Sequence, residues 1–260
     1  MSSANTDRVF ARCHKVVMSL AALILLIVTS CKKENMCDCF KSTGDFVEVE
    51  RDAGEFTDVF IKGNEDIVLV QDTVNRIIVR AGEHLIDMVE TKVSNGCLYI
   101  DNKIRCIWAR KYDARPVVTI HAKNFRYINS EGVGDVFCSN TIVQPDTFSM
   151  EVYNAMGVFH LSLNARASSI AFHTGPGDLE LSGKAGISYI YSNGFGILDA
   201  QHFDADTTVV TLMNLGDAYV SAGYFLAAGI NYLGNVYYRG NPTTIINNDA
   251  GEGALIFLEN

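Results

Sequence analysis

The chain has 260 residues, of which 48% are apolar and only 4 are proline, so it can bury a sizeable core within one all-β domain. Its formal net charge is −9. This acidic balance argues against a nucleic-acid partner, because phosphate contacts require clustered lysine and arginine.

Residues 1–31 have the pattern of a targeting segment. Three basic residues precede an apolar run of 13 residues, Val16–Val28, which is short for a membrane-spanning helix and typical of a secretory signal peptide. The sequence Val28-Thr29-Ser30-Cys31 resembles a bacterial lipobox, although an ordinary signal peptide ending in cysteine has the same pattern. We therefore predict a lipoprotein signal peptide over 1–31, acyl chains on Cys31 that insert into a lipid bilayer, and a tether over 32–45. The remaining chain has a net charge near −11, because residues 1–31 hold three basic residues and one acidic residue.

Export would allow disulfides to persist. Five cysteines follow Cys31, namely Cys37, Cys39, Cys97, Cys106 and Cys138. We expect a disulfide between Cys106 and either Cys37 or Cys39, and we expect Cys138 to remain a free, inert thiol in an interior column. Cys37 and Cys39 lack the spacing and the second pair of a zinc knuckle, so no metal site is predicted, and no motif indicates a cofactor.

Residues 46–125 are rich in strands but lack a clean repeat. Alternating or β-branched runs are found at Phe46–Glu50, Asp58–Ile61, Ile67–Val70, Arg76–Val79, Cys97–Asp101 and Val117–His121. We expect one helical turn within His84–Glu90. No linker separates this part from the C-terminal half, so we expect it to continue or to cap the same all-β body.

The C-terminal half has a glycine about every twenty residues. The successive steps are 23, 20, 19, 20, 18 and 19 residues, between Gly134, Gly157, Gly177, Gly196, Gly216, Gly234 and Gly253. A period in this range is typical of a stacked solenoid, in which each unit buries its face only against its neighbours. The fold class predicted is an all-β parallel β-solenoid with about seven C-terminal rungs, one turn each.

Alignment on these glycines predicts which side chains face the core. The residues two positions after each glycine are apolar in every rung: Val136, Phe159, Leu179, Leu198, Ala218, Val236 and Leu255. Four positions after come Cys138, Leu161, Leu181, Ala200, Val220, Tyr238 and Phe257. Because successive residues of a strand point to opposite faces, both columns belong to one buried face.

Three positions after each glycine lies the predicted outward column: Phe137, His160, Glu180, Asp199, Tyr219, Tyr237 and Ile256. Tyr219 and Tyr237, with Glu180, Asp199 and His160, are the candidate ligand-facing residues, since exposed rings beside polar groups suit recognition of a sugar or a protein. The alternative is that the rings only stack between rungs and stabilise the sheet. Glu180 and Asp199 on neighbouring rungs would also approach the carboxylate spacing of a glycosidase, but outward carboxylates are common on solvated sheets. We therefore predict no catalytic residue.

Three segments resemble a known family: "VERDAGEFTDVFIKGNEDIVLVQ" (Val49–Gln71), "GPGDLELSG" (Gly175–Gly183) and "GINYLGNVYYRGNP" (Gly229–Pro242). Together they are similar to the bacterial family called putative auto-transporter adhesin, head GIN domain, which is common in lipoproteins of the Bacteroidota. The resemblance covers residues 46–258. It implies a β-solenoid that is exported and often lipid-anchored, and it implies adhesion, with no catalytic residues to transfer.

We therefore expect a lipid-anchored protein of the cell envelope, held at the outer membrane, that acts as an adhesin or surface-recognition module for an extracellular glycan or protein and is not an enzyme. One alternative is a periplasmic structural or envelope-stress accessory protein. A third is a carbohydrate-active enzyme on a β-helix.

Overall fold

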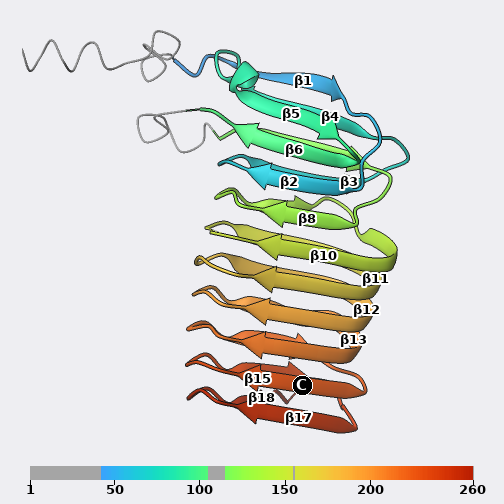
Figure 1. Ribbon diagram of the computed structural model, residues 1–260, viewed down its shortest axis with the longest axis vertical. Helices are drawn as coiled ribbons and strands as arrows, with labels where there is room; N and C mark the ends of the chain where they lie inside the picture. Colours follow the sequence, from blue (N-terminus) through green and yellow to red (C-terminus); the bar gives the residue numbers. More distant parts are fainter. Residues whose placement is uncertain (1–41, 105–114, 155, 260) are drawn as a thin grey trace, which may run out of the picture. The chain divides into compact units, whose positions relative to one another are not determined.

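The protein is described from a computed structural model over residues 42–104, 115–154 and 156–259. Residues 43–260 form one compact unit. The strands of the described residues form an 18-stranded sheet, which coils into a parallel β-solenoid of about six turns (Figure 1). This confirms the predicted fold class.

The N-terminal part begins the solenoid and also closes its end. Strand β2 pairs in parallel with β6 and β8, and β3 pairs in parallel with β7 and β9. Strand β4 is antiparallel to β7 and β1, and β5 is antiparallel to β6. The elements are β1 (Phe46–Asp52), β2 (Asp58–Lys62), β3 (Asp66–Gln71), β4 (Arg76–Gly82), the 3₁₀ helix η3 (Ile86–Met88), β5 (Val89–Ser94), β6 (Cys97–Asn102), β7 (Val117–Ala122), β8 (Tyr127–Ser130) and β9 (Val136–Cys138).

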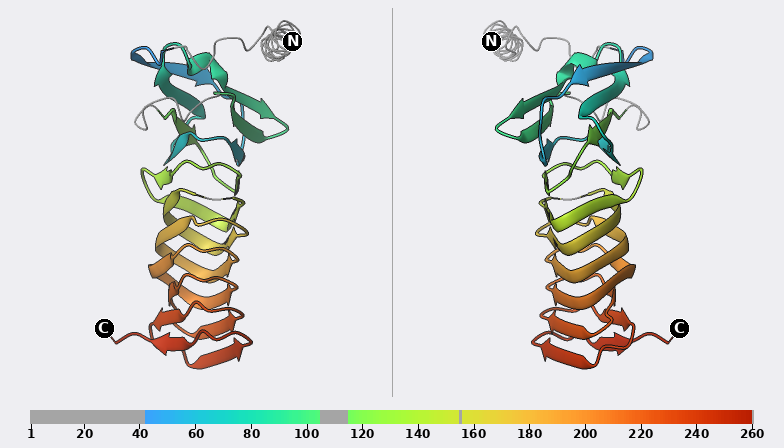
Figure 2. Two further views of the ribbon diagram at one scale, coloured as in Figure 1. Left: turned by 90° about the vertical axis from the view of Figure 1, so that its left-hand side faces the viewer. Right: turned by 90° about the vertical axis from the view of Figure 1, so that its right-hand side faces the viewer.

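The C-terminal rungs stack in parallel along the solenoid axis. Strands β11, β12 and β13 have 15 residues each and bend as they pass from one side of the stack to the other (Figure 2). Later rungs divide into shorter strands at this corner. The elements are β10 (Ile142–Val152), β11 (Val158–Phe172), β12 (Asp178–Ser192), β13 (Leu198–Leu212), β14 (Ala218–Ser221), β15 (Phe225–Ile230), β16 (Val236–Arg239), β17 (Thr244–Asp249) and β18 (Leu255–Phe257).

Two strand stacks result, and each has an outward face. The first face is the outer side of β9, the starts of β11–β13, β14, β16 and β18. The second face is the outer side of β6, β2, β8, the ends of β10–β13, β15 and β17. Figure 1 shows strands of the second face in the foreground.

The core lies between the stacks and contains the predicted inward columns. From Val136 to Val236, every residue two positions after a rung glycine is at most 1% exposed. The second inward column is buried from Leu161 to Val220, while Cys138 and Tyr238 are partly buried and packed against the core. Its last member, Phe257, is 51% exposed, so the inward prediction is wrong there, because β18 is the last strand of that stack that the structure describes. Period-two alternation predicted the buried face correctly in the other rungs.

Close approach of the rungs explains the repeated glycine. A Cβ atom at Gly134 would lie 1.8 Å from the carbonyl oxygen of Glu65, and one at Gly196 would lie 1.9 Å from that of Gly177. No side chain fits at such distances, so the stack requires glycine at each rung for steric reasons.

The residue after the glycine connects adjacent rungs. The Asp135 carboxylate accepts a hydrogen bond from the Val158 amide at 2.8 Å, and Asp178 accepts one from Ile197 at 2.7 Å. Asn235 does the same for the Ala254 amide at 3.0 Å. The Gly-Asp and Gly-Asn pairs thus satisfy turn amides of the next rung, which stabilises the stack beyond the local turn preference of these residues.

Both ends of the solenoid differ from its middle. At the N-terminal end, β1 is an exposed, charged edge strand, which discourages pairing with other chains. At the C-terminal end, Asn247 and Asp249 lie in register with the buried Ala228 and Ile230, so polar residues replace the core column in the last turn. Polar end units are what a solenoid requires for solubility.

Candidate recognition surfaces

The predicted outward column exists as a continuous ladder on the first face. Register pairs join Phe137 to His160, His160 to Glu180, Glu180 to Asp199, Asp199 to Tyr219, and Tyr219 to Tyr237. The structure therefore brings all five candidate ligand-facing residues onto one surface, on adjacent strands.

Contacts within the ladder define two parts. The Tyr219 and Tyr237 rings stack with centroids 4.9 Å apart and an interplanar angle of 11°. At the other part, the His160 ring stacks on Phe137 at 5.0 Å, and its Nδ1 lies 2.7 Å from a Glu180 carboxylate oxygen. Asp199 lies between these parts, and burial together with nearby carboxylates, including Asp199, raises the pKa of Tyr219.

A hollow of about 270 Å³ adjoins the His160 part of the ladder. It is lined by His160, Glu180 and Asp199, and also by His202, whose role the sequence did not indicate. The strand register shifts between Glu180 and Ser182, so that Ser182 pairs with His202 in place of Gln201. Counting five positions from each rung glycine would place Gln201 beside Ser182, so a count along an unbroken strand is wrong by one residue here.

The two carboxylates of the ladder are each engaged separately. Glu180 pairs with His160 and its side chain is 62% exposed. Asp199 accepts hydrogen bonds from the backbone and side-chain nitrogens of Gln201, at 3.1 and 2.8 Å. A glycosidase instead needs one sheltered acid facing a second carboxylate, so this geometry favours binding over catalysis. Within the described residues, no group of three or more His, Cys, Asp or Glu side chains could hold a metal ion.

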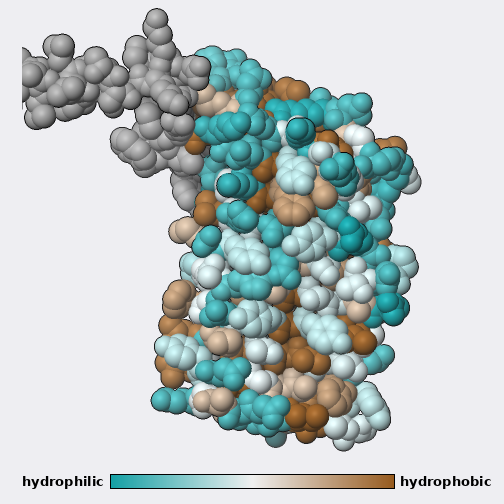
Figure 3. Space-filling view, in the orientation of Figure 1, coloured by the Kyte–Doolittle hydropathy of each residue, from teal (hydrophilic) through white to brown (hydrophobic). Residues whose placement is uncertain are grey.

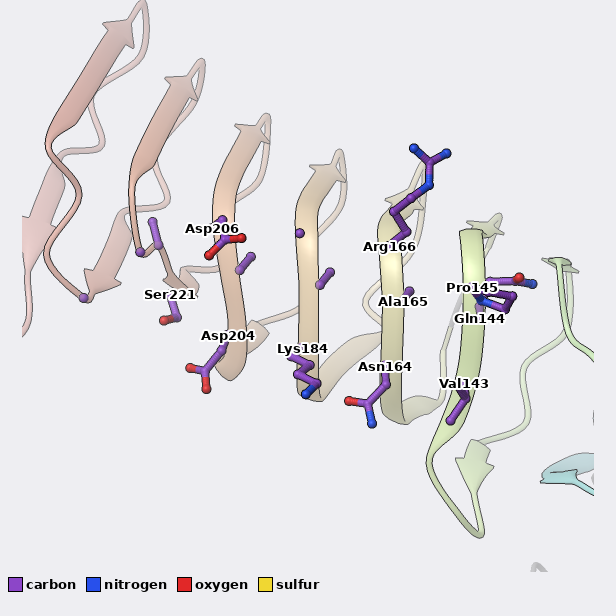
Figure 4. A pocket seen from close by; sticks show the side chains of 16 residues that line it. Val143, Gln144, Pro145, Asn164, Ala165, Arg166, Lys184, Asp204, Asp206 and Ser221 are labelled. Carbon is purple, nitrogen blue, oxygen red and sulfur yellow. The ribbon is translucent and has the colours of Figure 1, made fainter.

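A second hollow, of about 710 Å³, follows the corner where the long strands bend (Figure 4). Its floor consists of small residues in successive rungs, including Ala185, Ala205 and Ala222. Figure 4 shows Asn164, Lys184 and Asp204 projecting on one side and Arg166 and Asp206 on the other. This corner groove is polar on both walls and contains no aromatic side chain.

Four of the residues that precede rung glycines form an exposed apolar edge. Met156 is 66% exposed, Phe195 62%, Leu215 46% and Leu233 44%. The sequence shows that these positions are apolar but does not predict which way their side chains point, because they lie in turns where strand alternation stops.

The cysteines are only partly described. Cys97 and Cys138 are free, and burial raises the pKa of Cys138 to about 11, while its side chain is only partly buried and borders the hollow of about 270 Å³. Cys31, Cys37, Cys39 and Cys106 lie outside the described residues, as do the predicted signal peptide and most of the tether. In the part of the chain that is described, no helix is long and apolar enough to cross a membrane.

The fold and these surfaces define a class: a parallel β-solenoid whose outward faces carry side-chain ladders and open hollows. Residues 55–242 match the model of the family described as "Putative auto-transporter adhesin, head GIN domain", and the chain belongs to this family.

Solved structures with a similar fold come from Bacteroides and Parabacteroides species. A putative adhesin from Bacteroides fragilis is similar with a TM-score of 0.75 and 20% identity, over 82% of this chain and 97% of that one. A putative lipid binding protein from Parabacteroides distasonis has a TM-score of 0.61 and 19% identity, over 83% of this chain and 98% of that one. A putative adhesin from Parabacteroides merdae has a TM-score of 0.60 and 16% identity, over 83% and 97%. No curated protein matches the chain. At these identities the likeness establishes the fold.

Proposed function

We propose that this protein is a lipid-anchored adhesin of the cell envelope, held at the outer membrane through Cys31, which recognises an extracellular glycan or protein without catalysing a reaction. Family membership and the relatives described as adhesins support an envelope protein with a recognition role. The lipobox-like sequence ending at Cys31 supports the anchor.

The observation that carries the recognition role is the first-face ladder. The Tyr219–Tyr237 stack offers a flat apolar surface of low conformational entropy, and Asp199, Glu180 and His160 continue it with hydrogen-bonding groups. Ring faces suit the apolar side of a sugar, and carboxylates accept hydrogen bonds from its hydroxyl groups. The same arrangement also suits a polar peptide.

The anchor and the location are tested in cells. Replacement of Cys31 by Ser should abolish labelling of the protein with a fatty-acid analogue and release it from the membrane fraction. Protease treatment of intact cells should remove a C-terminal tag while a periplasmic control protein survives. A tag that is protected until the outer membrane is opened would contradict the adhesin proposal and favour a periplasmic accessory role.

Recognition is tested with a double variant, Tyr219→Ala with Tyr237→Ala. We expect loss of binding to cognate glycans or matrix proteins, with an unchanged melting temperature because both side chains lie on the outer face. A matched double variant at Tyr189 and Tyr224, which are exposed elsewhere, should bind normally. If the first variant melts at a lower temperature and keeps its binding, the rings serve only to stabilise the sheet.

A further inference from the structure

The second face carries an aromatic pocket that the repeat pattern did not indicate. Phe60 on β2 and Tyr99 on β6 stack with ring centroids 5.2 Å apart, and the Tyr127 ring lies 5.8 Å from Phe60. A hollow of about 420 Å³ lies over the first pair. This volume is within the range of small-molecule sites, about 300–1,000 Å³. Figure 3 shows several ring-shaped side chains gathered on the face that Figure 1 presents.

Strand register explains how the pocket is formed. Phe60 pairs with Tyr99, and Tyr99 pairs with Lys92 on β5, so these three side chains form one row. The neighbouring row contains Lys62, Asp101 and Glu90. These residues lie two positions later on β2 and β6 and two positions earlier on the antiparallel strand β5. Among the described strands, β5 pairs with β6 alone, and the β5–β6 hairpin projects to the side of the stack in Figure 2. The hairpin therefore widens the sheet locally and places charged groups around the two rings.

Some of the charged side chains that line this pocket have a partner among the described residues, and others do not. Glu90 forms an ion pair with Lys103. The side-chain ammonium groups of Lys62 and Lys92 make no hydrogen bond or ion pair with any described residue, although both side chains line the pocket. Asn129, Asp101 and Glu131 supply hydrogen-bond acceptors on the same lining. The lining is close to neutral, since Lys62 and Lys92 offset the carboxylates of Asp101 and Glu131 while Lys103 offsets Glu90, so an anion meets less repulsion here than on the acidic protein as a whole.

We propose that this pocket binds an acidic sugar, a pyranose with a carboxylate such as a hexuronate unit of an anionic polysaccharide. The Phe60–Tyr99 pair contacts the apolar face of the sugar ring, and Lys62 and Lys92 bind its carboxylate by charge-assisted hydrogen bonds. Asn129 and the pocket carboxylates accept hydrogen bonds from the hydroxyl groups. A neutral sugar leaves both ammonium groups unused, and an apolar ligand leaves every rim group unpaired.

This inference rests on the proposed recognition function and names a ligand class for it at a site separate from the first-face ladder. The test is calorimetric titration of the purified protein with oligogalacturonate and oligoglucuronate, using neutral oligomers of galactose and glucose as controls. We expect the acidic oligomers to bind at least tenfold more tightly than the neutral ones, and the difference to shrink as salt is added.

Variants assign the binding to the pocket. Tyr99→Ala should weaken acidic-sugar binding at least tenfold, Tyr99→Phe should retain it, and Lys62→Gln with Lys92→Gln should remove the preference for acidic over neutral oligomers. The Tyr219→Ala, Tyr237→Ala protein should bind acidic sugars normally. All these side chains point outward, so melting temperatures should be unchanged.

Equal binding of acidic and neutral oligomers, or acidic-sugar binding that survives the pocket substitutions, would overturn the inference. Loss of binding only in the Tyr219→Ala, Tyr237→Ala protein would overturn it and leave the proposed adhesin function intact. Absence of any sugar binding would also overturn it, while the cell-surface protease experiment tests the adhesin function independently.

Discussion

A buried carboxyl group near the start of the solenoid makes a quantitative prediction. Glu65 lies in the turn between β2 and β3, is 1% exposed, and has no hydrogen-bond partner for either carboxyl oxygen among the described residues. Burial raises its pKa from 4.5 to about 7, and nearby backbone N–H groups and the Asn102 amide offset part of that effect. The folded protein therefore holds a proton on Glu65 at pH values where the unfolded chain has released it.

The extra proton on Glu65 makes the free energy of unfolding depend on pH. Between about pH 4.5 and 7 the folded state binds one more proton than the unfolded state, so the free energy of unfolding falls as pH rises; above about pH 7 the loss is complete. The difference between the two pKa values corresponds to about 3 kcal/mol of unfolding free energy. Solvent screens this effect little because the side chain is buried.

The perturbation is Glu65→Gln, and the assay is urea unfolding at pH 4.5, 6 and 8. Relative to the native protein, the variant should gain up to about 3 kcal/mol of stability between pH 4.5 and 8, because glutamine cannot ionise. The exposed residue Glu50 provides the matched control, and Glu50→Gln should shift stability by less than about 0.5 kcal/mol at every pH. Parallel pH profiles for the native protein and Glu65→Gln would refute the reasoning.

Three further predictions concern the stack and the thiol. Gly196→Ala should lower the free energy of unfolding by about 1–3 kcal/mol or more through overpacking, whereas Gly54→Ala, whose added methyl group meets nothing within 4 Å, should be nearly neutral; equal urea midpoints for the two would contradict the steric explanation. Asp178→Ala should cost about 0.5–1.5 kcal/mol by removing a cross-rung hydrogen bond to a solvent-accessible turn amide, and Asp178→Asn should recover most of that loss, as measured by thermal unfolding; an asparagine variant as unstable as the alanine variant would count against the cross-rung hydrogen bond. Cys138 should resist alkylation at pH 8 in the folded protein and react rapidly in urea, as followed by peptide mass spectrometry; rapid labelling of the folded protein would show that its thiol is accessible.

The sequence predicted the C-terminal fold well because parallel stacking repeats the same contacts in every rung. Gly134 and Gly196 meet a carbonyl oxygen of the preceding rung, so one steric requirement recurs at each turn and produces the visible period. Alternation within each strand then assigned Phe159 and Leu198 to the core, where both are at most 1% exposed.

Prediction failed where the regular rung is interrupted. The register shift between Glu180 and Ser182 exchanges Gln201 for His202 beside the ladder, and no local composition announces it. In the N-terminal part, β2 pairs with β8 across about 69 residues, so the position of Phe60 beside Tyr127 depends on long-range pairing that periodicity cannot report.

The same distinction indicates where binding sites arise on a solenoid. A regular rung repeats its outward side chains on a flat ladder, which suits extended contacts such as those of Tyr219 and Tyr237. The pocket over Phe60 and Tyr99 depends on a departure from that regularity, because the strand that supplies Lys92 and Glu90 lies outside the repeating stack. That departure is the β5–β6 hairpin, which brings Lys92 and Tyr99 beside Phe60 and Lys62 of β2. The repeat therefore provides the scaffold, and the proposed selectivity for charge depends in part on a side chain of the non-repeating segment.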